Sequence, residues 1–307
     1  MGATLGKRLN RAKRGTSTSS FGTTERIGHD SSKFYESNLY ADVALTEVAS
    51  KDETSLPSEV ENAIIHRSSE QMKELPDNCI HLMITSPPYN VTKLYDGNLT
   101  LTQYFKLLER VLSETYRVLV NGGRACVNLA NVGRKPYIPF SDVLSQLMTK
   151  IGYNMRGEII WNKGSSAGVS MAWGSYQSAA NPVLRDVHEY ILVFSKGEYG
   201  RSQDGKVNTI TREQFMEWTK SIWTMNTESA KRVGHPAPFP EELPQRLIQL
   251  YSFKGDVVLD PFMGSGTTAL AALKAGRRFV GYEIDKAYIK LAERRIRAVK
   301  EQQVLEF

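Results

Sequence analysis

A short loop of serine, proline and tyrosine has the groups needed to hold an amino group on a flat ring. Ser86-Pro87-Pro88-Tyr89 follows an apolar run, 80–84, that we expect to be a buried strand. Two prolines stiffen the backbone and remove two N–H donors, so carbonyls remain as the exposed polar groups. The Ser86 hydroxyl and the Pro87 carbonyl then form an acceptor pair for an NH2 group, and Tyr89 can stack on its ring. A rigid turn with a core tyrosine is the alternative.

A glycine-rich loop near residue 260 has the composition of a cofactor-binding turn. Gly264 and Gly266 let the backbone approach a ligand, and the following helix offers free N–H groups. Asp260 would oppose a pyrophosphate but suits a ligand with an ammonium and a sulfonium. Glu283 ends the next strand, where a carboxylate can accept from both ribose hydroxyls. These points favour S-adenosylmethionine over NAD or a simple tight turn. The candidate cofactor-binding residues are Asp260, Phe262, Gly264, Ser265, Gly266, Thr267, Thr268 and Glu283.

Alternating short apolar runs and longer helical patterns predict βαβ units on a parallel sheet. The two loops are then expected at its carboxyl edge, where ligands bind in such sheets. Gly122-Gly123 is expected to end the first long helix. The expected strands are 63–65, 80–84, 124–129, 158–161, 188–194, 257–260 and 279–283, and the expected helices are a short one through residue 72, 100–120, 141–151, one ending near 251, 267–275 and 286–300.

The charge of the chain is concentrated at its N-terminus. The 307 residues carry a formal net charge of +6, and the first 24 residues contain five basic and no acidic side chains, which leaves about +1 for the rest. We expect this tail to be disordered; phosphate binding, simple solvation and an organelle transit peptide all remain open. Cys79 and Cys126 match neither a disulfide framework nor a metal pattern, so we expect a cytoplasmic protein without a metal. No apolar stretch reaches the ~18 residues of a membrane span.

Together the two loops resemble the signatures of DNA amino-methyltransferases. Ser86-Pro87-Pro88-Tyr89 is similar to their (Asp/Asn/Ser)-Pro-Pro-(Tyr/Phe) motif, and the stretch 235–283 is similar to their cofactor half. Catalytic motif first and cofactor loop last is the permuted order of the family's beta group. The resemblance covers roughly residues 60–300. It implies an α/β, Rossmann-like S-adenosylmethionine-dependent methyltransferase fold with a mostly parallel, doubly wound sheet in permuted order and a small target-recognition insertion.

The resemblance also implies an activity. The expected enzyme is a site-specific DNA methyltransferase that uses S-adenosyl-L-methionine to modify an amino group of a flipped-out base in double-stranded DNA. Serine in the first motif position mostly marks the cytosine N4 group in this family, and aspartate mostly marks adenine N6. Both bases present an amino donor beside a ring-nitrogen acceptor, so adenine stays open. The catalytic candidates are Ser86, Pro87, Pro88 and Tyr89.

Several further expectations follow from this resemblance. The protein would be the modification half of a restriction-modification system, with a cognate endonuclease acting on the same site; its oligomeric state stays open. RNA or protein-glutamine methyltransferases with an Asn-Pro-Pro-Tyr loop are an alternative among enzymes, and a non-catalytic DNA-binding module on the same scaffold is the alternative from another class. Carbon-5 methylation of cytosine needs a thiolate, usually from a Pro-Cys turn. Cys79 follows Asn78 and Cys126 follows Ala125, so we interpret both as structural thiols and set carbon-5 methylation aside.

Two positions near the motifs and one region each allow more than one interpretation. Ser68 stands where the family often has an acid near the adenine of the cofactor, and can replace it only weakly. Asn128 ends the strand after the catalytic one, where it can assist the base pocket or cap the strand. Trp218 and Trp223 either read bases or form local core, and the stretch 164–185 would help in reading. The expected organisation is a tail over 1–24, a docked segment over 25–60, a catalytic half over 61–197, a target-recognition region over 198–231 and a cofactor half over 232–307.

Overall fold

The computed structural model of the chain describes residues 35–43, 45–46, 48, 52–88, 99–164, 174–229, 233 and 239–305. The chain divides into two compact units, Met1–Leu45 and Thr46–Phe307. In the first unit, the described residues contain the single 3-10 turn η1 (Asn38–Tyr40), and the rings of Tyr35 and Tyr40 meet edge to face. Tyr35 and Leu39 are exposed. The tail over 1–24 lies outside the described residues.

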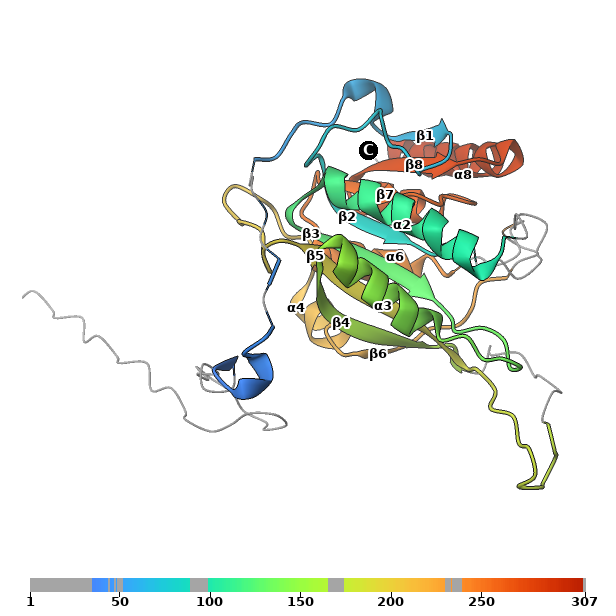
Figure 1. Ribbon diagram of the computed structural model, residues 1–307. Helices are drawn as coiled ribbons and strands as arrows, with labels where there is room; N and C mark the ends of the chain where they lie inside the picture. Colours follow the sequence, from blue (N-terminus) through green and yellow to red (C-terminus); the bar gives the residue numbers. More distant parts are fainter. Residues whose placement is uncertain are drawn as a thin grey trace, which may run out of the picture. The chain divides into compact units, whose positions relative to one another are not determined.

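The second unit is built on an eight-stranded sheet with the strand order β1-β8-β7-β2-β3-β5-β4-β6 (Figure 1). Within this sheet only β5 runs antiparallel to its neighbours, so the described strands form a mostly parallel sheet. The strands are β1 (Ala63–His66), β2 (Ile80–Thr85), β3 (Leu119–Leu129), β4 (Tyr153–Asn162), β5 (His188–Lys196), β6 (Ile222–Thr224), β7 (Val257–Asp260) and β8 (Arg278–Glu283).

Helices cover both faces of the sheet. α2 (Leu101–Val118) and α3 (Phe140–Ile151) pack on one face, in front of the sheet in Figure 1. α6 (Glu242–Tyr251), α7 (Thr267–Lys274) and α8 (Lys286–Leu305) pack on the other, together with the short α4 (Arg212–Trp218). Alternate residues of β2 serve the two cores: Met83 packs under α2 and Leu82 under α6 and α7. Burial on both faces explains why β2 is a continuous apolar run.

The winding of the sheet reverses between β2 and β7. From β2 the chain passes through α2 to β3 on one side, and from β7 it passes through α7 to β8 on the other side and the opposite face. Such a reversal is the topological switch point at which open α/β sheets bind ligands. The doubly wound, mostly parallel sheet in permuted order is therefore confirmed.

Two local expectations were wrong, and long-range contacts explain both. Gly122 and Gly123 do not end α2: the helix stops at Val118, and β3 runs through the glycines because Leu119 already pairs with Ile80 of β2. A Cβ on Gly122 would lie 2.3 Å from the Gly200 carbonyl oxygen, so close backbone passage requires the glycine.

The expected short helix through Met72 is a series of turns. Its backbone groups are satisfied by side chains of α2: the Met72 N–H donates to Glu114 Oε2 at 2.8 Å, and its carbonyl accepts from Arg117 at 2.9 Å. Backbone groups that find such partners do not need a helical ladder.

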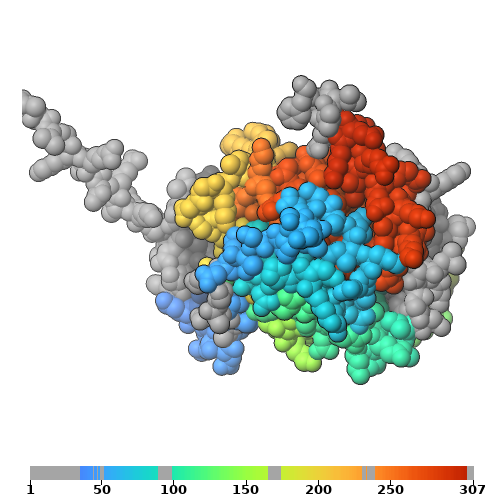
Figure 2. Space-filling model, turned by 90° about the horizontal axis from the view of Figure 1, so that it is seen from above, coloured from blue at the N-terminus to red at the C-terminus, as the bar shows by residue number. Residues whose placement is uncertain are grey.

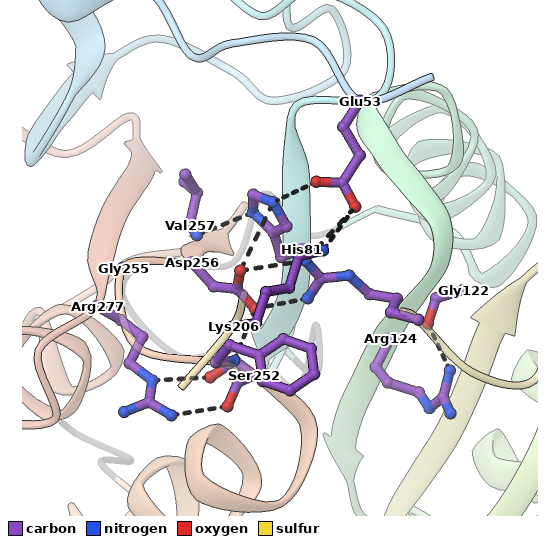
Figure 3. Close-up of polar contacts among 12 residues, drawn as sticks. Glu53, His81, Gly122, Arg124, Lys206, Ser252, Gly255, Asp256, Val257 and Arg277 are labelled. Carbon is purple, nitrogen blue, oxygen red and sulfur yellow. Dashed lines mark hydrogen bonds and ion pairs between the residues drawn. The ribbon is translucent and has the colours of Figure 1, made fainter. Parts of the chain in front are cut away.

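The edge of the sheet opposite to the two motif loops is held by a charged cluster (Figure 3). Because β5 is antiparallel, the chain after Lys196 emerges at this edge. There Arg201 binds Asp256 with two hydrogen bonds of 2.5 and 3.1 Å, and His81 accepts from the Val257 N–H at 3.0 Å. The hydrogen bond from His81 lowers the pKa of Glu53 to about 2. The cluster therefore fastens the chain around residues 53 and 201 to the starts of β2 and β7.

The first and last parts of the second unit lie side by side. β1 pairs with β8, α8 contacts β1, and Figure 2 shows the segment around β1 beside α8 on one face of the molecule. At the other side of the sheet from β1, β6 pairs with β4 as the outermost strand, and Trp223 of β6 is fully buried. Trp223 is thus local core. Within the residues described, no helix has both the length and the apolar character needed to cross a membrane.

Candidate active site

The two motif loops leave the sheet from neighbouring strands. β2 and β7 pair in parallel through Leu82 with Val258 and Met83 with Leu259. At the ends of the two strands, the Thr85 hydroxyl donates to Asp260 Oδ1 at 2.8 Å across a sequence separation of 175 residues. The Ser-Pro-Pro loop and the glycine loop therefore start at the same point of the carboxyl edge.

Asp260 connects the two loops from below rather than lining their surface. It is only 2% exposed and accepts from Thr85, from the Thr268 hydroxyl at 2.7 Å and from the Phe262 N–H at 3.0 Å. Burial raises the pKa of Asp260 to about 6, against the opposing effect of these hydrogen bonds. The expected attraction for a cationic ligand can therefore act only through the charge of Asp260 beneath the loop.

The hydroxyl side chains of the glycine loop also face inward. Arg295 of α8 donates to the Ser265 carbonyl at 2.6 Å, the Ser265 hydroxyl at 3.0 Å and the Thr267 hydroxyl at 3.3 Å. A Cβ on Gly266, where φ is 82°, would lie 2.8 Å from Ala292 Cβ. Ser265, Thr267 and Gly266 thus shape the loop against α8 and leave only backbone groups for a ligand. Arg295 was missed because its sequence signal is only one basic residue among many in α8.

A second missed residue supports the loop from the β1 side. The buried Ser69 hydroxyl donates to the Pro261 carbonyl at 2.8 Å, 192 residues away in the chain. Ser68, the weak substitute for the family's acid, instead donates to Glu70 Oε1 at 3.1 Å and accepts from the Glu70 N–H. Ser69 therefore has the structural connection to the cofactor loop, and Ser68 forms a local turn.

Phe262, Gly264 and Glu283 are the predicted cofactor residues that reach the surface. Glu283 Oε2 accepts from the Gly264 N–H at 2.8 Å, and Oε1 accepts from the N–H groups of Ile284 and Asp285, both at 2.8 Å. A carboxylate has about four acceptor sites. Three backbone donors orient Glu283 in advance and leave about one site for a ribose hydroxyl.

This set of groups fits S-adenosylmethionine. Phe262 offers an apolar ring, Gly264 an approachable backbone and Glu283 an oriented carboxylate, all at the switch point and above the charge of Asp260. When bound, the cofactor supplies a methyl group on a positively charged sulfur. Among the described residues, no group of three or more His, Cys, Asp or Glu side chains is placed to hold a metal ion.

We expect Glu283→Ala to raise the dissociation constant of S-adenosylhomocysteine roughly ten- to hundredfold, since charge-assisted hydrogen bonds contribute about 1.5–3 kcal/mol. Glu283→Gln should fall between, because the amide keeps an acceptor but loses the charge. Calorimetric titration measures both, with the exposed Glu293→Ala on α8 as the control. Equal affinities in all four proteins would show that Glu283 does not contact the ribose.

The raised pKa of Asp260 predicts a pH dependence of cofactor binding. Its ordinary value is 3.8 and its folded value about 6, so the folded protein takes up a proton as the pH falls through about 6. Protonation relieves the cost of a buried charge but removes the attraction for the sulfonium. S-adenosylmethionine affinity should therefore fall between pH 7 and 5, and that of uncharged-sulfur S-adenosylhomocysteine should fall less. Parallel pH profiles for the two ligands would contradict this.

The catalytic loop begins directly after the Thr85–Asp260 contact. Pro87 is buried, Ser86 and Pro88 are half-buried, and Tyr89 lies outside the described residues, so its stacking role stays a prediction. Asn128, next to Val127, which pairs with Thr85, brings its Nδ2 to 3.5 Å from Ser86 Oγ. The structure thus places Asn128 beside Ser86, the candidate catalytic serine.

Both cysteines are buried thiols. Burial raises the pKa of Cys79 to about 11 and that of Cys126 to about 12. A thiol that stays protonated near neutral pH is a poor nucleophile. Neither cysteine therefore supplies the thiolate that carbon-5 methylation requires.

Comparison with known proteins agrees with this site. The family model described as DNA methylase, for N6 and N4 amino-methylation, matches residues 80–294. The type II methyltransferase M.MjaI of Methanocaldococcus jannaschii is 32% identical over 76% of this chain and 90% of its own. The DNA adenine methyltransferase YhdJ of Escherichia coli is 30% identical over 76% of this chain and 82% of its own.

A solved structure adds the cofactor. The Thermus thermophilus protein TTHA0409, in complex with S-adenosyl-L-methionine, is 29% identical and covers 77% of this chain and 94% of its own, with a TM-score of 0.62. Two adjacent motif loops, a fitting cofactor surface and a family match over most of the chain lead to one assignment. The chain belongs to the N6/N4 DNA methylase family and is an S-adenosylmethionine-dependent DNA amino-methyltransferase of the restriction-modification type.

Proposed function

We propose that this enzyme methylates the exocyclic N4 amino group of cytosine in double-stranded DNA. The observation that carries the proposal is the uncharged Ser86 at the first motif position, with the uncharged Asn128 amide 3.5 Å from its hydroxyl. In the family, serine at this position mostly accompanies cytosine, and aspartate mostly accompanies adenine. The Ser86 hydroxyl and the Pro87 carbonyl accept the two amino hydrogens, which turns the nitrogen lone pair toward the methyl donor.

The target base must leave the helix to reach this site. An amino nitrogen inside a stacked duplex is hidden from a methyl donor, so we infer that the nucleotide is flipped out at a cost of a few kcal/mol. The enzyme would then protect DNA from a cognate restriction endonuclease that cleaves the same sequence.

Mass spectrometry of nucleosides tests the base directly. Plasmid DNA is incubated with the protein and S-adenosylmethionine, digested completely, and compared with standards of N4-methylcytidine and N6-methyladenosine in their deoxy forms. We expect N4-methylcytosine alone. N6-methyladenine would overturn the cytosine assignment while leaving the amino-methyltransferase in place, and sequencing of the modified positions gives the recognition site.

Adenine N6 is the second candidate, and one comparison favours it. YhdJ, which is described as a DNA adenine methyltransferase, is 30% identical to this chain. The mass-spectrometric test separates the two bases without further assumptions.

We propose that the β4–β5 connection, rather than the first part of the region 198–231, reads the DNA sequence. β4 ends at Asn162 and β5 begins at His188, at the carboxyl edge with the motif loops, whereas the chain around 201 lies at the opposite edge. An ion pair between Arg134 and Asp186 connects this segment to the loop after β3.

Two substitutions at opposite ends of the sheet would test this assignment. Arg185→Ala in the β4–β5 connection should change the methylated sequence or weaken DNA binding. Lys254→Ala, exposed near the start of β7 at the opposite edge, should change neither. An altered methylated sequence in Lys254→Ala, with none in Arg185→Ala, would contradict this assignment.

A further inference from the structure

A chain of polar side chains, buried at Asn128 and partly buried elsewhere, lies behind Ser86 and crosses three strands. Lys163, just after β4, binds Glu189 Oε1 of β5 at 2.7 Å. The other carboxylate oxygen of Glu189 accepts from Asn128 Nδ2 of β3 at 2.7 Å, and the same Nδ2 lies 3.5 Å from Ser86 Oγ. Asn128 is 2% exposed, and the Glu189 side chain is 12% exposed. Of these residues, only Ser86 belongs to one of the two motifs.

The carboxylate determines which way the Asn128 amide points. An ionised carboxylate only accepts hydrogen bonds, so it can be satisfied only by the NH2 side of the amide. Lys163 compensates the charge of Glu189 in this partly buried place. Asn128 is thereby prevented from rotating its amide, and its second N–H is directed at the Ser86 hydroxyl.

The arrangement is not one that stability alone explains. Asn128 Oδ1 is buried and has no hydrogen-bond partner among the described residues. A buried unpaired acceptor costs free energy and calls for a functional reason. The strands themselves are already joined by ladders, with Asn128 opposite Ile191 and Trp161 opposite Glu189, so the side-chain link is not needed to hold them together.

We propose that Glu189, supported by Lys163, is a positioning residue that acts through Asn128 to orient the Ser86 hydroxyl for catalysis. A serine hydroxyl has one proton and two lone pairs. Donation from Asn128 occupies one lone pair and turns the other toward the amino group of the target base. This inference rests on the proposed role of Ser86 as an acceptor of the amino group.

The test compares kinetics and stability in Glu189→Gln. Glutamine can donate as well as accept, so the Asn128 amide is no longer held in one orientation. We expect kcat to fall roughly 10–100-fold, by analogy with removal of a partner that orients a metal-ligating side chain. The KM for DNA and the dissociation constant of S-adenosylhomocysteine should stay within about twofold. The exposed Glu158→Gln on β4 is the matched control and should leave kcat unchanged.

A reversed pair separates positioning from packing. The double variant Asn128→Asp with Glu189→Gln restores a hydrogen bond between the two positions but presents an acceptor, not a donor, to Ser86. We expect the melting temperature of the double variant to equal that of the unmodified protein, while its kcat remains low. Recovery of kcat together with stability would show that only packing matters and would overturn the proposal.

A double-mutant cycle with Ser86 completes the test. If Glu189 acts through Ser86, adding Glu189→Gln to Ser86→Ala should lower kcat little further. The same loss in both backgrounds would show that Glu189 acts independently of Ser86, and the proposal would be wrong while the role of Ser86 stands. An unchanged rate in Ser86→Ala alone would instead refute the proposed function of the serine.

Discussion

Ser86→Ala is expected to lower kcat for DNA methylation roughly 10²–10³-fold, the loss seen when one transition-state hydrogen-bond partner is removed. Ser86 is half-buried directly after β2, and the motif Ser86-Pro87-Pro88-Tyr89 contains no charged side chain that could replace its hydroxyl. Alanine leaves Pro87 and Pro88 to keep the loop rigid. The affinity for S-adenosylhomocysteine should therefore be unchanged, because the cofactor surface is on the other loop.

Single-turnover methylation of a duplex with labelled cofactor measures this loss apart from product release. Ser113→Ala, an exposed serine on α2, is the matched control and should behave as the unmodified protein. A rate within a few-fold of normal for Ser86→Ala would mean that the Pro87 carbonyl alone positions the amino group.

Asp260→Ala is expected to damage both stability and cofactor binding. Its carboxylate holds Thr85, Thr268 and the Phe262 N–H, all of which would lose a buried partner. Charge-assisted hydrogen bonds contribute about 1.5–3 kcal/mol each. The cost of burying the charge, visible in the raised pKa, offsets part of this. We expect a net loss of about 2–4 kcal/mol, or a melting temperature lower by roughly 4–15 °C for a chain of this size.

The cofactor titration of the same variant is the more diagnostic measurement. Without Asp260 the glycine loop loses its anchor to β2, so S-adenosylmethionine affinity should fall by more than about a hundredfold, as three such bonds and a charge are lost. Asp260→Asn keeps the shape but not the charge, and should be more stable than the alanine variant while still binding weakly. Normal affinity in Asp260→Ala would show that the loop holds its shape without this anchor.

Much of the candidate site could be predicted because its motifs are short and local. The acceptor pair of Ser86 and Pro87, the glycine turn and the carboxylate of Glu283 follow from residue types within a few positions of a strand end. The parallel, doubly wound order followed from the alternation of apolar runs and helical patterns. The residues next to a strand end therefore largely predict which groups that end offers to a ligand.

The unpredicted parts depend on partners that are distant in the sequence. Ser69 reaches Pro261 across 192 residues and Arg295 reaches Ser265 across 30, and no local pattern indicates either contact. The reversal of β5 was also hidden, because its composition is that of any buried strand. That reversal carries the chain after Lys196 to the end of the sheet opposite the motif loops, so the start of the expected target-recognition region 198–231 lies away from the candidate site.

The adjacency of β2 and β7 has a consequence for the synthesis of this protein on the ribosome. β2 is buried along its whole length, and its partner β7 follows only about 175 residues later. At ~5–20 residues per second, β2 waits roughly 10–35 s with one edge unpaired. An apolar strand with a free edge is a template for aggregation. A chain whose translation stops before residue 257 therefore yields no partly active enzyme, but an exposed sheet edge that chaperones must cover or proteases must remove.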